Sequence, residues 1–409
     1  MSPTDNQNNN KILIIGGGIG GLVVAQGLKK LNIPFILFER DESSSFRQQG
    51  YRLRINPEGS QALKQVLSDD IWELFTSSCA VFNSGQTQID AITGDISSRS
   101  SANRIHFPER DNMVFSADRT LLRCVLESGL KQHLEYGKKF ERYEMIKSAD
   151  GQDLIEAHFS DGSKYIGTLL IGADGLNSKV RKQFIPELKY LDTCGRAIYG
   201  KTPITNSLLT KLPASVMEWT TIISDSRPLT LFMEPIKFRP PTPGKETQLP
   251  IVQDYIYWVL LSQAQVFGKS DKELYAMSES ELKQHQLEMI KDWNEPIKNI
   301  IIHSDESKSS YLSITSSKPD VYQWETNKNI TLLGDSCHAM TPTGGAGANT
   351  AIIDAFHLVE AIKNGAAVND LNQYECKMRQ YAKVSIEGSL GGAKRMFGFK
   401  SIDDCKFID

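Results

Sequence analysis

Four short apolar runs mark buried strands along the chain. Residues 12–15 and 35–38 are unbroken apolar tetrapeptides, and residues 169–171 and 330–333 repeat the pattern much later. Runs of this length without polar alternation are typical of strands covered on both faces of a parallel sheet. Between the first two runs, residues 22–31 have the apolar spacing of a helix. These elements predict an α/β fold with a Rossmann-type parallel sheet.

Residues 186–265 have a different pattern. The segments VMEWTTIIS, LTLFMEP and DYIYWVLLS combine strand-forming residues with large rings, and turns containing proline join them. They predict an antiparallel sheet with one face available to an apolar ligand, although each ring taken singly could equally belong to a core. Alternation places Met217 and Trp219 on one face and Glu218 on the other. The candidate substrate residues are Arg196, Met217, Trp219, Phe232 and Tyr257.

Composition narrows the class of protein. A chain of 409 residues is too long for one core and predicts two or three domains. The net charge of -3 argues against nucleic acid as a partner. No apolar window is long enough to span a membrane, and the polar first ten residues indicate a disordered tail rather than a signal peptide. The six scattered cysteines lack metal-ligand spacing, so we expect free thiols in a reducing cytoplasm and no metal site.

The first chemical motif is Gly16-x-Gly18-x-x-Gly21, placed between a predicted strand and a predicted helix. In a dinucleotide site the first glycine makes the tight turn, the second lets the backbone approach the pyrophosphate, and the third lets helix and strand pack closely. The pyrophosphate then faces the helix N-terminus, where free N–H groups favour negative charge. Glu39 ends the second strand, where a carboxylate can accept from ribose hydroxyls. A flexible glycine loop is the alternative, but strand, helix and acid in register favour a dinucleotide.

Three further polar positions lie beside predicted strands or helices. Arg54 shares one face of a strand with Arg52, which is either an ordinary solvated edge or a position near the cofactor. Arg119 lies in the first turn of a helix, where a cation is unfavourable, so it either contacts an anion or is a surface arginine. Asp174, at a strand end beside glycine, is placed to make an Asx turn.

A second glycine-rich loop, residues 342–349, follows the turn Gly334-Asp335. It opens a helix at 350–362, and a glycine-lined helix N-terminus suggests another anion or polarised oxygen beside it. His338 is either catalytic or structural. Because Asp335 lies close by in a turn, the structural role is favoured.

Together, three separated motifs resemble a known enzyme family. They are GGGIGG at 16–21 with Glu39-Arg40, GADG at 172–175, and GDSCHAMTPTGGAGAN at 334–349. The set resembles the single-component FAD-dependent aromatic monooxygenases of the para-hydroxybenzoate hydroxylase fold, in order over nearly the whole chain. The chain length and its ending, including YECKMRQYAKVSIEGS, also resemble the tetracycline-inactivating and fungal salicylate-hydroxylase-like members.

This resemblance implies a Rossmann-type FAD-binding domain with an inserted antiparallel-sheet substrate domain and a C-terminal helix. The expected boundaries are 11–78, 112–186 and 320–362 for the FAD-binding domain, 79–111 and 187–319 for the substrate domain, and 363–409 for the C-terminal helical segment.

The resemblance also implies which positions hold FAD. The glycines of the first motif lie at the pyrophosphate, Glu39 at the adenosine ribose and Arg40 beside the adenine. Arg119 contacts the flavin side, Asp174 serves both FAD and NAD(P)H, and Asp335 meets the ribityl and pyrophosphate portion. The second glycine-rich loop lies beside the isoalloxazine ring. The full cofactor set is Gly16, Gly18, Ile19, Gly20, Gly21, Glu39, Arg40, Arg54, Arg119, Asp174, Gly334, Asp335, Pro342, Gly345, Gly347, Ala348 and Asn349.

The implied activity is oxygenation of an aromatic or polyketide-like small molecule. NAD(P)H reduces the flavin, O2 adds as a C4a-hydroperoxide, and this species transfers oxygen to an electron-rich carbon. Only one dinucleotide motif is present, so NAD(P)H must bind transiently, and no side chain is identified as catalytic. Two alternatives stay open: an FAD oxidase, dehydrogenase or cyclase on the same fold, and a non-catalytic flavin-binding module.

Overall fold

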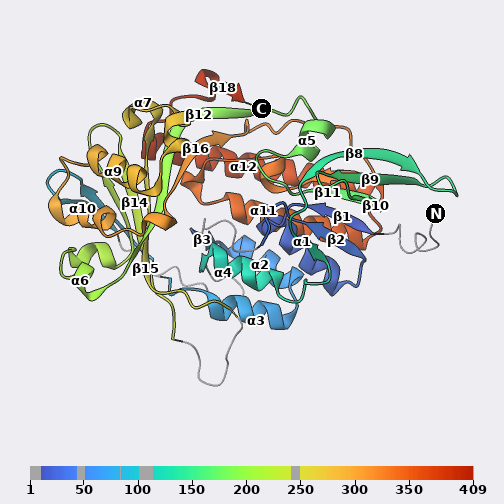
Figure 1. Ribbon diagram of the computed structural model, residues 1–409, viewed down its shortest axis with the longest axis horizontal. Helices are drawn as coiled ribbons and strands as arrows, with labels where there is room; N and C mark the ends of the chain where they lie inside the picture. The colour runs from blue at the N-terminus through green and yellow to red at the C-terminus, as the bar shows by residue number, and fades with distance from the viewer. Residues whose placement is uncertain (1–10, 44–50, 83, 101–113, 241–248, 409) are drawn as a thin grey trace.

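In the computed structural model, which describes residues 11–43, 51–82, 84–100, 114–240 and 249–408, a five-stranded parallel sheet forms one end of the molecule (Figure 1). Its strands in spatial order are β17 (Ile330–Leu332), β11 (Leu169–Gly172), β1 (Ile12–Ile15), β2 (Phe35–Phe38) and β7 (Leu134–Glu135). Each neighbouring pair is parallel. The four apolar runs of the sequence are therefore adjacent strands, and the predicted α/β fold class is confirmed.

Helices and a small sheet pack on the parallel sheet. Its helices are α1 (Ile19–Lys30), α2 (Pro57–Val66), α3 (Asp69–Ser78), α4 (Arg119–Glu127), α5 (Lys179–Phe184) and α11 (Gly347–Lys363). A three-stranded antiparallel sheet, β8 (Phe140–Lys147), β9 (Asp153–Phe159) and β10 (Lys164–Gly167), lies outermost (Figure 1). Phe38 of β2 contacts Phe159 and Tyr165 with ring centroids 4.6 Å apart in both pairs, which joins the two sheets through aromatic packing.

An eight-stranded sheet forms the other end of the molecule. Its path is β16 (Ser310–Ser316), β12 (Tyr190–Pro203), β15 (Tyr255–Gln263), β14 (Thr230–Ile236), β13 (Thr220–Ser224), β4 (Gln86–Asp90) and β5 (Ile96–Ser100), with β18 (Lys406–Ile408) paired to β12. All pairs are antiparallel except β13 with β4. The predicted antiparallel sheet is confirmed, with this one parallel pair added.

The two faces of the eight-stranded sheet have different neighbours. Ile198, Met233 and Trp258 lie on the face covered by helices. Those helices are α6 (Asn206–Leu209), α7 (Ala264–Phe267), α8 (Asp271–Ala276), α9 (Glu279–Met289) and α10 (Glu295–Ile302). Alternate residues point the other way, towards the parallel sheet. We call the surface formed by Tyr199, Lys201, Phe232, Glu234, Tyr255 and Tyr257 the tyrosine face.

Two elements connect the tyrosine face to the parallel sheet. One is the antiparallel ribbon of β3 (Arg52–Ile55) and β6 (Phe115–Asp118). The other is the long helix α12 (Val368–Phe397), whose Ile386, Leu390 and Phe397 share a core with Tyr255 and Tyr257. The domain boundaries expected from the sequence stay a prediction.

One predicted strand begins later than expected. The strand at 216–224 starts only at Thr220, because Met217 ends the 3-10 turn η2 (Ala214–Met217) and Glu218 and Trp219 form a bend. The predicted alternation of Met217 and Trp219 against Glu218 is therefore wrong. The remaining 3-10 turns are η3 (Glu306–Lys308), η4 (Gly334–Ser336), η5 (Pro342–Gly344) and η6 (Ile402–Asp404).

Two sequence expectations concern the ends and surroundings of the fold. The polar tail at residues 1–10 lies outside the described residues. Of the helices in the described ranges, none has the length and apolar character needed to cross a bilayer.

Candidate cofactor and substrate site

The first glycine motif closes the turn between β1 and α1. Gly16 has φ +111°, and a Cβ there would lie 2.3 Å from the Ala173 carbonyl oxygen. A Cβ at Gly21 would lie 2.1 Å from the Gly16 carbonyl oxygen. At Gly18, the N-cap of α1, a Cβ would meet no atom within 4 Å, and no side chain caps the helix. Gly18 thus faces open space beside N–H groups that no side chain caps, which is the geometry that an anion such as a pyrophosphate requires.

Glu39 is held beside this loop at the end of β2. Its Oε2 accepts a hydrogen bond from the Gly17 N–H at 2.8 Å, and its Oε1 accepts from the Asp41 N–H at 3.0 Å. The carboxylate is therefore oriented before any ligand binds. The neighbouring Arg40 is exposed and lies 4.0 Å from Asp41.

Replacing Glu39 by alanine should weaken FAD binding by about 1–3 kcal/mol, the usual cost of losing a hydrogen bond to a charged group. The dissociation constant would rise roughly 5- to 150-fold. Titration of the apoprotein with FAD, followed by flavin fluorescence, measures this change. The exposed Glu42 is the matched control, and its alanine variant should bind FAD as the wild type does. Unchanged affinity in Glu39→Ala would place the ribose elsewhere.

The second glycine loop sets up another helix N-terminus next to the first. Gly334 has φ +64° and Gly345 has φ +61°, so both turns use the left-handed region that favours glycine. No side chain caps α11, and a Cβ at Gly347 would lie 4.0 Å from the exposed Asp335 carboxylate. A Cβ at Gly20 of α1 would lie 3.4 Å from Ala351 Cβ. The uncapped starts of α1 and α11 therefore lie side by side.

Two other segments hold this second loop. Asn349 donates to the carbonyl oxygen of Arg54 at 2.8 Å and accepts from the Asn56 N–H at 2.9 Å, which ties the loop to β3. On its other side, the hydroxyls of Thr341 and Thr343 both donate to the carbonyl oxygen of Ser389 in α12, at 3.0 and 2.7 Å. The structure thus brings the predicted residues Arg54, Gly345 and Asn349 together.

Arg119 and Asp174 have different surroundings. Arg119 begins α4, donates its N–H to the Tyr51 carbonyl at 3.0 Å and places its guanidinium 5.4 Å from the Tyr51 ring centroid. Asp174 accepts hydrogen bonds from the Ser178 hydroxyl at 2.5 Å and the Lys179 N–H at 2.8 Å. These bonds commit Asp174 to the turn that starts α5, as an Asx-type turn would. They give no support to the expected cofactor contact.

His338 is a buried structural residue whose partner was not foreseen. It is 1% exposed, and its Nε2 lies 2.6 Å from Asp354 of α11 rather than bonding to Asp335. Asp354 also accepts from the Gly334 N–H at 2.8 Å and the Tyr381 hydroxyl at 2.5 Å. Burial opposes the charged imidazolium, but the Asp354 carboxylate outweighs it and raises the pKa of His338. Asp354 lies within the apolar run AIIDAF, and a carboxylate in such a run is the sequence signal that could have identified it as a buried partner.

The substrate candidates divide into two groups. Phe232 and Tyr257 lie on the tyrosine face with ring centroids 6.2 Å apart, and Tyr257 stacks on Tyr199 at 6.3 Å. Met217 packs with the core on the helical face of the sheet. Trp219 donates to the Thr87 hydroxyl at 2.6 Å and packs on β4.

Arg196 is not available for a substrate. Its Nε and Nη2 donate to Asp271 at 2.6 and 3.0 Å. Its Nη1 and Nη2 donate to Asp192 at 2.8 and 3.0 Å, and Nη1 also donates to the Gly195 carbonyl at 2.9 Å. A guanidinium has five N–H donors, and all five are used. The expected substrate contact of Arg196 is therefore not supported.

Sequence reasoning missed a buried polar group beside the tyrosine face. Asp118 accepts from the Lys201 ammonium at 2.7 Å and the Tyr255 hydroxyl at 2.8 Å, and also from the Thr120 N–H at 2.8 Å. It therefore caps α4 and joins that helix to the tyrosine face. The adjacent Arg52 pairs with Glu234 in the same interface.

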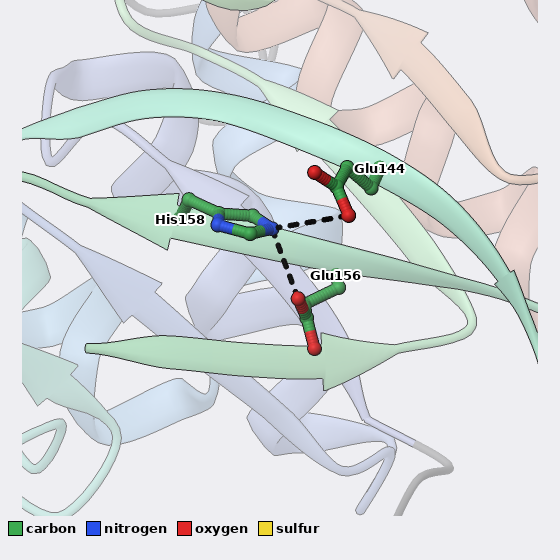
Figure 2. A group of neighbouring side chains, drawn as sticks. All are labelled: Glu144, Glu156 and His158. Atoms are coloured by element: carbon green, nitrogen blue, oxygen red, sulfur yellow. Dashed lines mark ion pairs between the residues drawn. The ribbon is translucent and has the colours of Figure 1, made fainter. Parts of the chain in front are cut away.

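A second polar cluster lies away from this site, on the outer three-stranded sheet. Glu144, Glu156 and the buried His158 bring their polar atoms together (Figure 2). Arg142 pairs with Glu144, and Lys164 lies 3.0 Å from Glu156. Because each carboxylate already has a cationic partner, the cluster is accounted for by ion pairing.

Known proteins are similar to this chain in both sequence and fold. A family model described as the FAD binding domain matches residues 159–389, more than half of the chain. The chain is 34% identical over 422 residues to the dual O-methyltransferase/FAD-dependent monooxygenase CTB3 of Cercospora beticola, covering 98% of this chain and 48% of that protein. This chain thus spans about half the length of these curated relatives.

Two solved structures support the fold. An FAD-containing monooxygenase candidate from Photorhabdus luminescens superposes with a TM-score of 0.80 at 28% identity, covering 96% of this chain and 100% of that one. The tetracycline destructase Tet(51) superposes with a TM-score of 0.67 at 18% identity, covering 96% and 92% of the two chains. The second likeness concerns the fold alone.

Proposed function

This chain belongs to the FAD binding domain family, and on that premise we propose that it is an FAD-dependent monooxygenase that uses NAD(P)H and O2 to hydroxylate a phenolic, aromatic or polyketide-like small molecule. The observation that carries the proposal is the pair of adjacent, uncapped helix N-termini of α1 and α11. Arg54 links the start of α11 to the aromatic sheet face, because its carbonyl oxygen bonds to Asn349 and its side chain lies 3.5 Å from Glu234. Helix N-termini suit the anionic and polarised atoms of a flavin dinucleotide, and the aromatic face suits a flat apolar substrate.

The residues of the site fit FAD. Gly18 leaves room for the pyrophosphate, Glu39 is oriented for a ribose, and the start of α11 presents backbone N–H groups for a flavin ring oxygen. When bound, FAD supplies the transfer of electrons from NAD(P)H and the activation of O2. The polypeptide then has to hold the substrate in one orientation and exclude water. Phe232, Tyr199 and Tyr257 provide the surface for that task.

The curated relatives support a phenolic substrate. Their names pair the monooxygenase with an O-methyltransferase in one chain. Methyl transfer to oxygen needs an oxygen acceptor, and a phenol is one compound that supplies it. A phenol is also electron-rich, which favours attack by an electrophilic oxygen.

A panel of phenols tests the function directly. Purified protein, FAD and NADH or NADPH are incubated with each phenol under isotopically labelled O2. The expected result is a product that carries one labelled oxygen atom, formed as NAD(P)H is consumed. Hydrogen peroxide in place of an oxygenated product would favour an oxidase or dehydrogenase. Bound FAD that NAD(P)H never reduces would favour a non-catalytic flavin-binding module.

Replacing Phe232 by alanine should uncouple the reaction. The loss of a ring from the tyrosine face lets the substrate drift, and misplacement by about an ångström can cost up to ~100-fold in rate. We expect the ratio of product to NAD(P)H consumed to fall about 10-fold while hydrogen peroxide rises. The matched control is Tyr275→Ala, which removes an exposed ring from the helical side of the sheet. Equal coupling in the two variants would remove Phe232 from the substrate surface.

A further inference from the structure

Arg54 is a cation with poor local partners at the edge of the tyrosine face. Its side chain is 40% exposed, and its nearest polar contacts are the Thr220 hydroxyl at 3.4 Å and Glu234 at 3.5 Å. Its Nε is buried without a hydrogen-bond partner. Phe82 packs on one side, with its ring centroid 5.0 Å from the guanidinium carbon. Most of the hydrogen-bonding capacity of this guanidinium is therefore unused.

The charges around Arg54 do not balance. Glu234 is already paired with Arg52, and those side chains are only 5% and 8% exposed. The nearby Asp118 is paired with Lys201. In the part of the chain that the structure describes, one carboxylate thus serves two arginines and leaves one positive charge over. Burial and the charge of Arg52 lower the pKa of Arg54, against the opposing effect of Glu234.

The position of Arg54 indicates which ligand its unbalanced positive charge could bind. Its carbonyl oxygen is bonded to Asn349 at the start of α11, the helix end assigned above to the flavin ring. Its side chain points to Thr220 and Glu234 of the eight-stranded sheet, on the tyrosine-face side. The main chain of Arg54 is thus bonded to the second glycine loop, while its guanidinium reaches Thr220 and Glu234 of the eight-stranded sheet.

We propose that Arg54 binds an anionic oxygen of the substrate, either a carboxylate or an ionised phenol, while the ring of the substrate lies on Phe232 and Tyr257. This inference rests on the proposed monooxygenase function and names the substrate class. An arginine fork can bind such an oxygen with two parallel hydrogen bonds, and the surplus charge is neutralised when it does. A neutral substrate would leave that charge without a partner in a partly buried site.

Pairs of ligands that differ only in charge test the inference. Salicylate is compared with salicylamide, and 3-hydroxy-2-naphthoate with its amide, by the change that each causes in the flavin absorbance of the holoprotein. The wild type should prefer the anion of each pair. In Arg54→Gln this preference should fall roughly 10- to 150-fold, the range expected for a hydrogen bond to a charged group. Arg54→Lys should retain part of the preference for the anion, since lysine keeps the positive charge but lacks the two parallel N–H donors of the guanidinium.

Controls separate this role from others. Arg99→Gln removes an exposed arginine at the edge of the same sheet and should leave the preference intact. The proposal replaces the cofactor contact expected for Arg54 by a substrate contact, so Arg54→Gln should keep its FAD. The variant should also raise the melting temperature of the ligand-free protein, because repulsion with Arg52 is removed. Loss of FAD in Arg54→Gln would make Arg54 a cofactor residue and overturn the inference. So would a wild type that shows no preference for the anion in any pair, whether or not oxygenation is observed. Failure of the monooxygenase proposal appears separately, as absence of labelled product.

Discussion

Replacing Gly18 by valine should give a protein that folds normally and carries no FAD. The backbone at Gly18 has φ -73° and ψ 178°, which valine adopts readily, and a Cβ there meets no atom within 4 Å. The added side chain would instead occupy the space that the pyrophosphate needs beside α1. We expect FAD affinity to fall at least ~100-fold, about 3 kcal/mol or more.

The measurements are the ratio of flavin to protein after purification and the thermal unfolding of the apoprotein. Gly388→Val is the matched control, because Gly388 is exposed on α12 with no atom within 4 Å of an added Cβ. Gly21→Val should fail differently: its Cβ would lie 2.1 Å from the Gly16 carbonyl oxygen, so the fold itself should be lost. Full flavin occupancy in Gly18→Val would contradict the assignment of this loop to FAD.

Replacing His338 by alanine should destabilise the protein by about 3–5 kcal/mol, because it leaves the Asp354 carboxylate buried without its charged partner. Chemical denaturation measures this loss in the free energy of unfolding. The double variant His338→Ala/Asp354→Asn should recover part of it, since no lone charge then remains. Gly334 also bonds to Asp354, so weaker FAD retention should accompany the loss of stability.

The stabilising effect of His338 should depend on pH. Its pKa is raised in the folded protein, so the stabilisation is fully present below the unfolded value of about 6.5 and is lost as pH rises through the folded pKa. The difference in unfolding free energy between wild type and His338→Ala should therefore shrink on the alkaline side. A variant that keeps its fold and flavin yet loses product formation about 1,000-fold would instead make His338 a general base.

The sequence predicted the turn of the first glycine motif because the geometry of that turn is local. Gly16, Gly18, Gly21 and Glu39 lie within one strand–helix–strand unit, and the strained φ of Gly16 is a property of that turn. Spacing along the chain therefore carries the information that places these residues together.

Side-chain partners were harder to predict because they come from distant segments. Arg196 gives two of its five donors to Asp271, 75 residues away, and the others to Asp192 and the Gly195 carbonyl oxygen. Trp219 turned away from the expected strand face because Thr87, 132 residues earlier, accepts its indole N–H. Arg54 lies beside Glu234, 180 residues later, because the ribbon of β3 and β6 packs against the eight-stranded sheet. The periodic pattern of apolar and polar residues along the chain carries no information about contacts between such distant side chains.

The hydrogen bonds from Thr341 and Thr343 to Ser389 can form only after most of the chain has been synthesised. The strands that flank the first glycine motif are synthesised early in the chain. Thr343, by contrast, donates to a carbonyl oxygen that is synthesised 46 residues later. A nascent chain that ends before Ser389 has the turn of the first glycine motif but lacks the carbonyl oxygen that holds the second glycine loop. If the proposed assignment of the two loops holds, the cofactor site is completed from its adenine end to its flavin end. Truncation within α12 should yield protein that loses FAD although its parallel sheet is intact.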